Sequence, residues 1–174
     1  MVKKLFIFML ILATVFASVS PLMARGSDIT AFNTTRLTTT LDVNGAGTGT
    51  TESVTFTKGG SAVVIADSDM TITSASGTKL KYAEITLTNY KDSDEIQTSN
   101  VNSKFTITNT TDTTEATIYV KLAGEYTFAD YVTALKAMKY NNKDANCDGT
   151  TREITFRLCN GPFSNICTTE IIIN

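Results

Sequence analysis

The sequence predicts an all-β fold, an antiparallel β-sandwich crossed by one short helix. Segments in which apolar and polar residues alternate recur along the chain, and clusters of Gly, Asn, Asp and Ser separate them. Threonine, a β-branched residue that suits the wet face of a sheet, is abundant. At least six such segments with short connections favour two packed sheets.

The six segments each place their apolar residues on one face. In chain order they read ESVTFTK, LKYAEITLTN, KFTITN, EATIYVKL, REITFRLC and ICTTEIII. In the first five, the residues expected to face the core are Val54, Phe56, Ala83, Ile85, Leu87, Phe105, Ile107, Ile118, Val120, Leu122, Ile154, Phe156 and Leu158.

One segment breaks this period of two. In YTFADYVTALKAMKYNN, apolar residues recur at helical spacing, and Thr127 followed by Asp130 is typical of a helix start. The pattern predicts a helix of two to three turns that crosses between the sheets. Its expected apolar face consists of Phe128, Tyr131, Val132, Leu135 and Met138, and we interpret it as core.

The N-terminal residues predict export. Lys3 and Lys4 precede an unbroken apolar run, residues 5–13, which is too short to span a bilayer. We expect a signal peptide over residues 1–24, with cleavage after Ala17 or, because Pro21 ends the apolar helix, after Ala24. A flexible arm over residues 25–40 and one domain over residues 41–174 should follow. The mature protein is therefore expected outside the cell or at its surface, without membrane insertion.

Composition argues against several functions. Removing Lys3 and Lys4 takes the formal charge from −2 to about −4, and an acidic surface does not favour nucleic acid. The chain contains no histidine and no tryptophan. Without histidine, the commonest general base is missing, and serine or cysteine nucleophiles lack their usual partner. We expect no enzymatic activity and no required cofactor.

The three cysteines should meet an oxidising environment if the chain is exported. Cys159 and Cys167 flank a short connection between two strand segments, so we expect a disulfide between them. Cys147 would then stay unpaired or join another chain.

Three acidic turns are candidate calcium sites. Asp144, Asn146 and Asp148, followed by Gly149, match the first half of an EF-hand loop, but its closing glutamate is replaced by Thr155. A solvated turn and weak calcium binding both remain open interpretations. Two further turns are weaker candidates, with the pairs Asp67 and Asp69, and Asp92 and Asp94.

Several phrases, taken together and in order, resemble a known family. They are LDVNGAGTGTTESVTFTKGGSAVVIADSDMTIT, AEITLTNYKDSDE, YTFADYVTALKAMKYNN and REITFRLCNG. They are similar to the cadherin-like, Ig-like repeats of large bacterial surface proteins, here in a single copy from about Leu41 onward. The resemblance implies a Greek-key sandwich used in surface structure and adhesion, often stiffened by calcium between domains.

The chain departs from the family where calcium ligands are expected. Lys58 stands where the family has Glu, Ser74 and Ser76 where it has an Asp-x-Asp phrase, and Asn160 where it has Asp. Because calcium needs several carboxylates, these replacements predict that the inherited inter-domain site is lost.

Three classes of function remain. The first is a secreted, non-catalytic module that binds a protein, a cell-surface or matrix component, or itself. The second is a filament or surface-layer subunit that donates its N-terminal arm as a strand to a neighbour's sheet edge. The third is a calcium- or carbohydrate-binding module, with Tyr82, Tyr90 and Tyr119 as the candidate sugar contacts.

Overall fold

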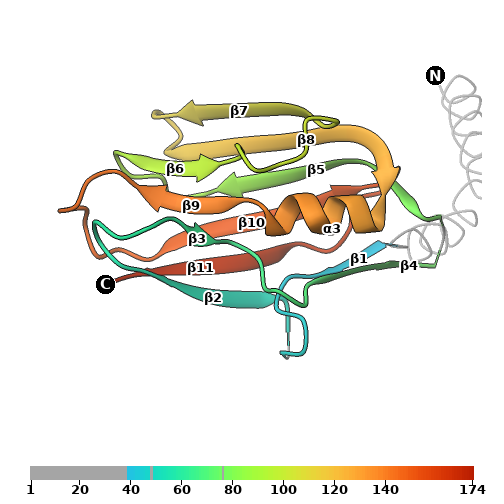
Figure 1. Cartoon of the computed structure of the whole chain (residues 1–174), viewed down its shortest axis with the longest axis horizontal. Coiled ribbons are helices and arrows are strands. Elements are labelled where there is room, and N and C mark those ends of the chain that lie inside the picture. The colour runs from blue at the N-terminus through green and yellow to red at the C-terminus, as the bar shows by residue number, and fades with distance from the viewer. Residues whose placement is uncertain (1–38, 48, 76) are drawn as a thin grey trace, which may run out of the picture. The chain divides into compact units, whose positions relative to one another are not determined.

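The predicted all-β sandwich is confirmed (Figure 1). The computed structural model describes residues 39–47, 49–75 and 77–174. The expected signal peptide, most of the expected arm, and Ser76 lie outside the described residues. Thr39 and Thr40, which we expected in the arm, instead belong to a strand.

The main sheet has six strands in the order β2-β11-β10-β5-β8-β7. Their bounds are β2 Thr51–Phe56, β5 Lys79–Leu87, β7 Thr106–Asp112, β8 Thr117–Thr127, β10 Arg152–Cys159 and β11 Cys167–Ile173. All neighbours are antiparallel except β2 and β11, which run parallel and depart from the antiparallel prediction. The strands β7 and β2 form the two edges of this sheet.

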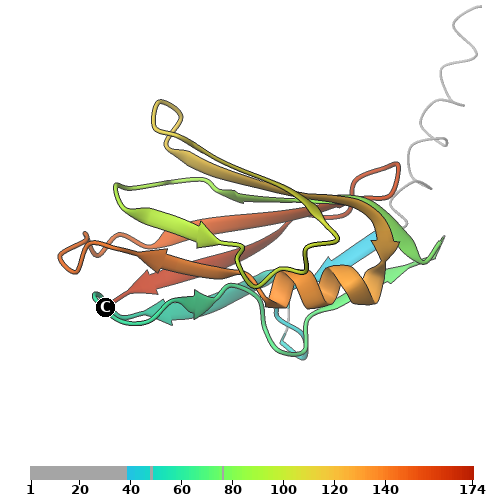
Figure 2. The same cartoon turned by 45° about the horizontal axis from the view of Figure 1, so that its top comes forward.

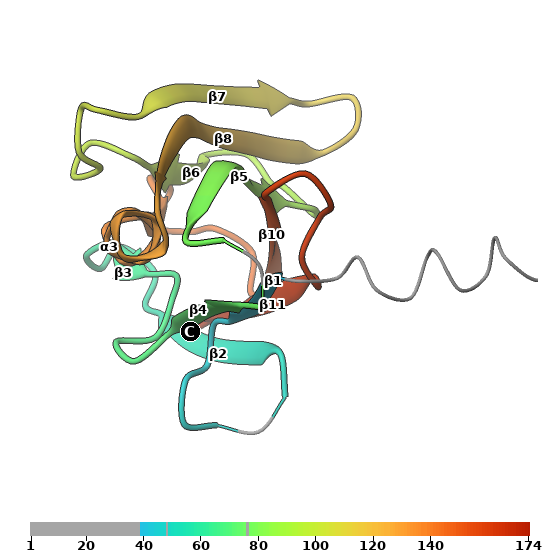
Figure 3. The same cartoon turned by 90° about the vertical axis from the view of Figure 1, so that its right-hand side faces the viewer.

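Two smaller sheets complete the sandwich. One has the order β3-β9-β6, with bounds β3 Val63–Val64, β9 Lys139–Asn142 and β6 Asp94–Gln97. The other pairs β1, Thr39–Asp42, with β4, Thr71–Ser74. Figures 1 and 2 show the three-stranded sheet and the helix on one face of the main sheet, and Figure 3 shows these layers end-on.

The core lies between these layers and follows the predicted alternation. Eleven of the thirteen residues expected to face inward are buried, while Val54 and Ile107 are partly buried and pack against the core. Because the side chains of a strand alternate between its faces, the opposite face of the main sheet carries the polar residues.

The helix α3, Phe128–Lys136, joins β8 of the main sheet to β9 of the smaller sheet, as predicted. Its capping box is present: the Thr127 side chain accepts from the Asp130 backbone, and the Asp130 carboxylate accepts from the Thr127 backbone. The predicted apolar face extends too far, because Met138 lies beyond the helix and the chain continues as β9. Among the described residues, no helix has the length and apolar character needed to cross a bilayer.

Candidate functional site

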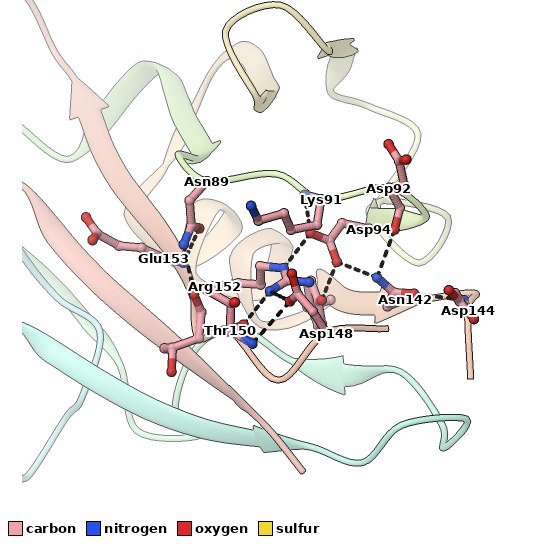
Figure 4. Close-up of polar contacts among 12 residues, drawn as sticks. Asn89, Lys91, Asp92, Asp94, Asn142, Asp144, Asp148, Thr150, Arg152 and Glu153 are labelled. Atoms are coloured by element: carbon pink, nitrogen blue, oxygen red, sulfur yellow. Dashed lines mark hydrogen bonds and ion pairs between the residues drawn. The ribbon is translucent and has the colours of Figure 1, made fainter. Parts of the chain in front are cut away.

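Two of the acidic turns meet at one end of the sandwich, and a buried arginine joins them (Figure 4). Arg152 begins β10, and Asp94 begins β6. Both side chains are completely buried, and Arg152 Nε lies 2.6 Å from Asp94 Oδ2. On its other side, Arg152 Nη1 lies 2.8 Å from Asp148 Oδ1. The turns that we considered as separate calcium candidates are therefore bridged by a cation of the protein itself.

Asp94 is the centre of this network. Its Oδ1 accepts hydrogen bonds from Tyr140 Oη at 2.5 Å and from Asn142 Nδ2 at 2.6 Å. Its Oδ2 accepts from Arg152 Nε and, at 2.8 Å, from the backbone of Lys91. A buried carboxylate is stable only when such partners replace water, and Asp94 has four. Both carboxylate oxygens of Asp94 are therefore occupied by hydrogen bonds within the protein.

The electrostatics agree with this geometry. Burial alone would lower the pKa of Arg152, but hydrogen bonds to Asp94 and Asp148 raise it above its usual value. The hydrogen bond from Arg152 holds the pKa of Asp148 below its usual value. Burial, and then the bond to Asp94, raises the pKa of the Tyr140 phenol. The charged states of Arg152 and Asp148 and the neutral state of the Tyr140 phenol are therefore favoured.

The turn at residues 144–149 does not offer its oxygens as a calcium site would. Asp144 Oδ1 accepts from the Asn146 backbone at 2.8 Å, and Asp148 Oδ1 accepts from the Thr150 backbone at 3.1 Å as well as from Arg152. These are the self-satisfied bonds of Asx turns. Nothing else in the turn supplies the closing carboxylate that an EF-hand loop requires.

Lys58 adds a second cation near the same turn. A Cβ placed on Gly149 would lie 4.0 Å from Lys58 Nζ, and one placed on Gly59 would lie 3.3 Å from the Ala145 side chain. The loop that follows β2 therefore packs beside the 144–149 turn. Within residues 39–47, 49–75 and 77–174, no three His, Cys, Asp or Glu side chains gather in a group that could hold a metal. The residues present do not fit the calcium site that the resemblance implies.

The third acidic turn stays separate from this network. Asp67 Oδ1 accepts from the Asp69 backbone and from Ser68, while Asp69 Oδ2 accepts from the Ala46 backbone at 2.9 Å. The bond from the Asp69 backbone is the largest cause of the lowered pKa of Asp67. The Asp67 carboxylate accepts hydrogen bonds within its own turn, and the Asp69 carboxylate joins the turn to the loop after β1.

The disulfide expected between Cys159 and Cys167 is not formed, and all three cysteines are free and buried. The strand register gives the reason, because Cys167 lies opposite Phe156 and so faces the core. Cys159 lies three residues further along β10 and points to the other face. Cys147 is only 6% exposed, which does not favour a link to another chain.

The face of the main sheet that points away from the core carries an ordered cluster. We call it the outer-face patch, and it consists of Tyr82, Glu84, Tyr119, Lys121, Arg157 and Phe163. The register places Lys121, Glu84 and Arg157 in one row across β8, β5 and β10. Arg157 Nη2 lies 2.9 Å from Glu84 Oε2, and Tyr119 Oη donates to Glu84 Oε1 at 3.0 Å.

Aromatic rings and cations interleave in the same patch. Lys121 Nζ lies 4.2 Å from the centre of the Tyr82 ring, and the Arg157 guanidinium lies 3.7 Å from the centre of the Phe163 ring. The Tyr82 and Phe163 rings meet edge to face at 6.1 Å. Such contacts fix the side chains in place before any partner arrives.

The tyrosines that we named as sugar contacts have different environments. Tyr82 and Tyr119 lie in the outer-face patch, whereas Tyr90 packs against the core. The hydrogen bond with Cys159 raises the pKa of Tyr82 to about 12, and burial raises the pKa of Tyr119 to about 12. A sugar that stacks on Tyr82 would have to displace Lys121 from the ring face that it covers.

A shallow hollow of about 280 Å³ opens within the patch. Its lining comprises Glu84, Thr86, Tyr119, Thr155, Arg157 and Ile166, and Ile166 is 57% exposed. Ordered Tyr and Arg side chains around an exposed apolar residue are typical of protein contact surfaces. The sequence alternation assigned Tyr119 to the polar face, but no sequence signal brought Phe163 and Ile166 to it.

No protein-family model matches this chain, and no curated protein matches it.

Proposed function

We propose that this protein is a non-catalytic β-sandwich module that acts through surface contact, in cell-surface adhesion or in extracellular or envelope structure. The observation that carries the proposal is the outer-face patch. Its charged and aromatic side chains are partly exposed and already held in one arrangement by Glu84 and by the two cation–ring contacts. A pre-organised surface loses little side-chain entropy when a partner binds.

The buried polar network supports a structural rather than a chemical role for the acidic turns. Arg152 and Asp94 are inaccessible, and their partners saturate Asp94. The network joins β6, β9 and β10 at one end of the sandwich, with the Arg152 guanidinium between Asp94 and Asp148. This contact network supports the proposal that the module presents its surface without calcium.

The experiment that tests this function compares binding of the exported protein with that of a Tyr119→Ala/Arg157→Ala variant, on whole cells and on immobilised matrix proteins. Truncating these two residues should weaken binding at least about 30-fold, because the loss of even one central contact residue costs about 2 kcal/mol or more. Glu153→Gln, an exposed position on the same sheet, is the matched control and should bind normally. A wild-type protein that binds no surface and does not self-associate would rule the function out.

A second candidate function, a filament or surface-layer subunit, is favoured by one further observation. The main sheet ends in β7, a regular seven-residue strand whose outer edge pairs with no other strand in the described part of the chain. An exposed strand edge is a template for pairing with another chain.

A further inference from the structure

The edge of β7 lacks the features that normally protect a strand edge. Its sequence is TITNTTD, with no proline and no lysine, and its register with β8 runs without a bulge from Thr106 to Asp112. Six of its seven residues are exposed. Natural edges are usually blocked by lysine, proline, a bulge or a covering segment. In Figures 1 and 3, no described segment lies beyond β7.

The two faces of β7 also differ. Ile107 packs against the core, and Asn109 Nδ2 donates to the Ile96 backbone of β6 at 2.9 Å, so both point inward. The residues between them, Thr106, Thr108 and Thr110, point to the outer face. A strand added at this edge would need small or apolar residues on the inward side.

The expected N-terminal arm has a sequence that fits this requirement. Residues 25–38 read RGSDITAFNTTRLT, without proline and rich in β-branched residues. Fourteen residues in extended form cover about 46 Å, twice the length of a seven-residue strand. Ile29 and Ala31 lie two residues apart and provide an apolar pair for the inward side, while Asp28, Thr30 and Phe32 share the opposite phase.

Charge selects one register. Asp28 and Arg36 are eight residues apart, as are Lys104, which lies in the turn two residues before β7, and Asp112, the last residue of β7. A parallel strand in that register sets Arg36 beside Asp112 and Asp28 beside Lys104, which already pairs with Asp130. The antiparallel alternative centred on the same residues sets like charges together at both ends, which is unfavourable.

The same parallel register satisfies the apolar pattern. It sets Ala31 beside Ile107 of β7, which packs against the core, and brings Ile29 next to Phe105, a buried residue immediately before β7. Residues that lie opposite each other in neighbouring strands share a face of the sheet, so Ile29 and Ala31 would face inward.

In this register Arg36 cannot lie beside Asp112 of its own molecule. Arg36 is three residues before Thr39, where β1 begins, and three residues span at most about 11 Å. The strand β1 contacts β10, and β10 is separated from β7 by β5 and β8, which makes about 14 Å across the sheet. Figure 1 also shows β1 and the Asp112 end of β7 at opposite ends of the sandwich.

We propose that residues 25–38 of a second copy add to the outer edge of β7 as a parallel strand, with Arg36 beside Asp112. This inference rests on the second candidate function and names its acceptor, register and direction. Because each copy donates at one place and accepts at another, the contact is head-to-tail and builds an open chain of copies.

Engineered cysteines test the register directly in the exported protein, whose first residue is established by mass spectrometry. In the proposed pairing, Thr34 of one copy lies beside Thr110 of the next, at a spacing of about 5 Å that a disulfide can bridge. A variant with both Thr34→Cys and Thr110→Cys should form a ladder of covalent oligomers on mild oxidation. The native cysteines are buried, so the unsubstituted protein controls for background.

The matched control moves one cysteine by four residues. The pair Thr30→Cys with Thr110→Cys should not cross-link, because those positions would be neighbours only in the antiparallel arrangement. Efficient cross-linking of this pair, a covalent ring within one molecule, or no cross-linking of either pair would each overturn the proposal. Mixing the Thr34→Cys protein with the Thr110→Cys protein should give covalent dimers and nothing larger.

A charge reversal gives an independent readout without changing the folded domain. Arg36→Glu should weaken association at least about tenfold, seen by light scattering as a shift of the monomer–oligomer midpoint to higher concentration. An unchanged midpoint would contradict the proposed register. The outer-face variant Tyr119→Ala/Arg157→Ala should still form the ladder. If no ladder forms but that variant still loses surface binding, strand addition is wrong and the contact function stands.

Discussion

The substitution Asp94→Ala should destabilise the protein more than any other single change of a polar residue described above. The Arg152 side chain would stay fully buried, and its remaining charged partner, Asp148, is 49% exposed. Tyr140 and Asn142 would each lose a short hydrogen bond to a buried acceptor. Breaking a buried ion pair by removing one partner costs about 3–5 kcal/mol, a large part of the 5–15 kcal/mol that holds a typical domain together.

Urea unfolding followed by circular dichroism measures this loss as a change of midpoint at constant slope. A double-mutant cycle with Arg152→Met separates the ion pair from the other contacts, and a coupling of about 2 kcal/mol is expected. Asp92→Ala, an exposed neighbour in the same turn, is the matched control and should cost less than about 0.5 kcal/mol. An Asp94→Ala protein as stable as the Asp92→Ala protein would refute the network as a structural fastening.

The remaining predictions concern acid, the helix cap, the tyrosines and the thiols. Three aspartates whose pKa is lowered in the folded state stabilise it above pH 3.8, so the free energy of unfolding should fall as the pH drops below about 4. These aspartates are Asp67, Asp130 and Asp148. Thr127→Ala should cost about 1 kcal/mol in urea unfolding because the cap is lost, whereas Thr127→Ser should be nearly neutral. Spectrophotometric titration should show Tyr82 and Tyr119 ionising near pH 12, and stability should fall as the pH rises from 10 towards 12, because the unfolded phenols ionise first. Alkylation should label three thiols in the denatured protein and almost none in the folded protein. If only one thiol is labelled in the denatured, unreduced protein, the Cys159–Cys167 disulfide is present after all.

Much of the fold could be predicted from alternation alone. In a strand with one apolar face, the sequence determines which side chains face the core, because a register shift of one residue would move all the apolar side chains to the solvent face. The short strands β1, β3, β4, β6 and β9 were not predicted, since two to four residues carry too little pattern. The overlong helix has a similar cause: Met138, which packs in the core before β9, continued the helical spacing by coincidence.

The buried network had a sequence signal that we did not use. Arg152 shares the inward phase of Ile154 in REITFRLC, and Asp94 shares the inward phase of Ile96 in DEIQ. Two opposite charges on inward phases indicate a buried pair, since either alone would be costly. No sequence pattern predicts that Arg152 and Asp94 contact each other, because 58 residues separate them along the chain.

Part of the outer-face patch could be predicted from the sequence, and part could not. The alternation identified the polar phase of β8, and hence Tyr119, from the sequence. The row Lys121, Glu84 and Arg157 depends on the register between three strands, which a single sequence does not contain. Phe163 reaches the patch from the connection between β10 and β11, whose path is set only by tertiary packing.

The central claim is that a cation of the protein itself, Arg152, holds the turns of Asp94 and Asp148 together, so that these turns need no metal. Thermal unfolding of the protein without residues 1–24, in EDTA and in 1 mM calcium, tests it most directly. We predict midpoints that agree within about 1 °C. A calcium site with a dissociation constant of 10 μM would add about 2.7 kcal/mol at that concentration and raise the midpoint by several degrees. Such a rise would contradict the claim and make a metal-stiffened module the better account.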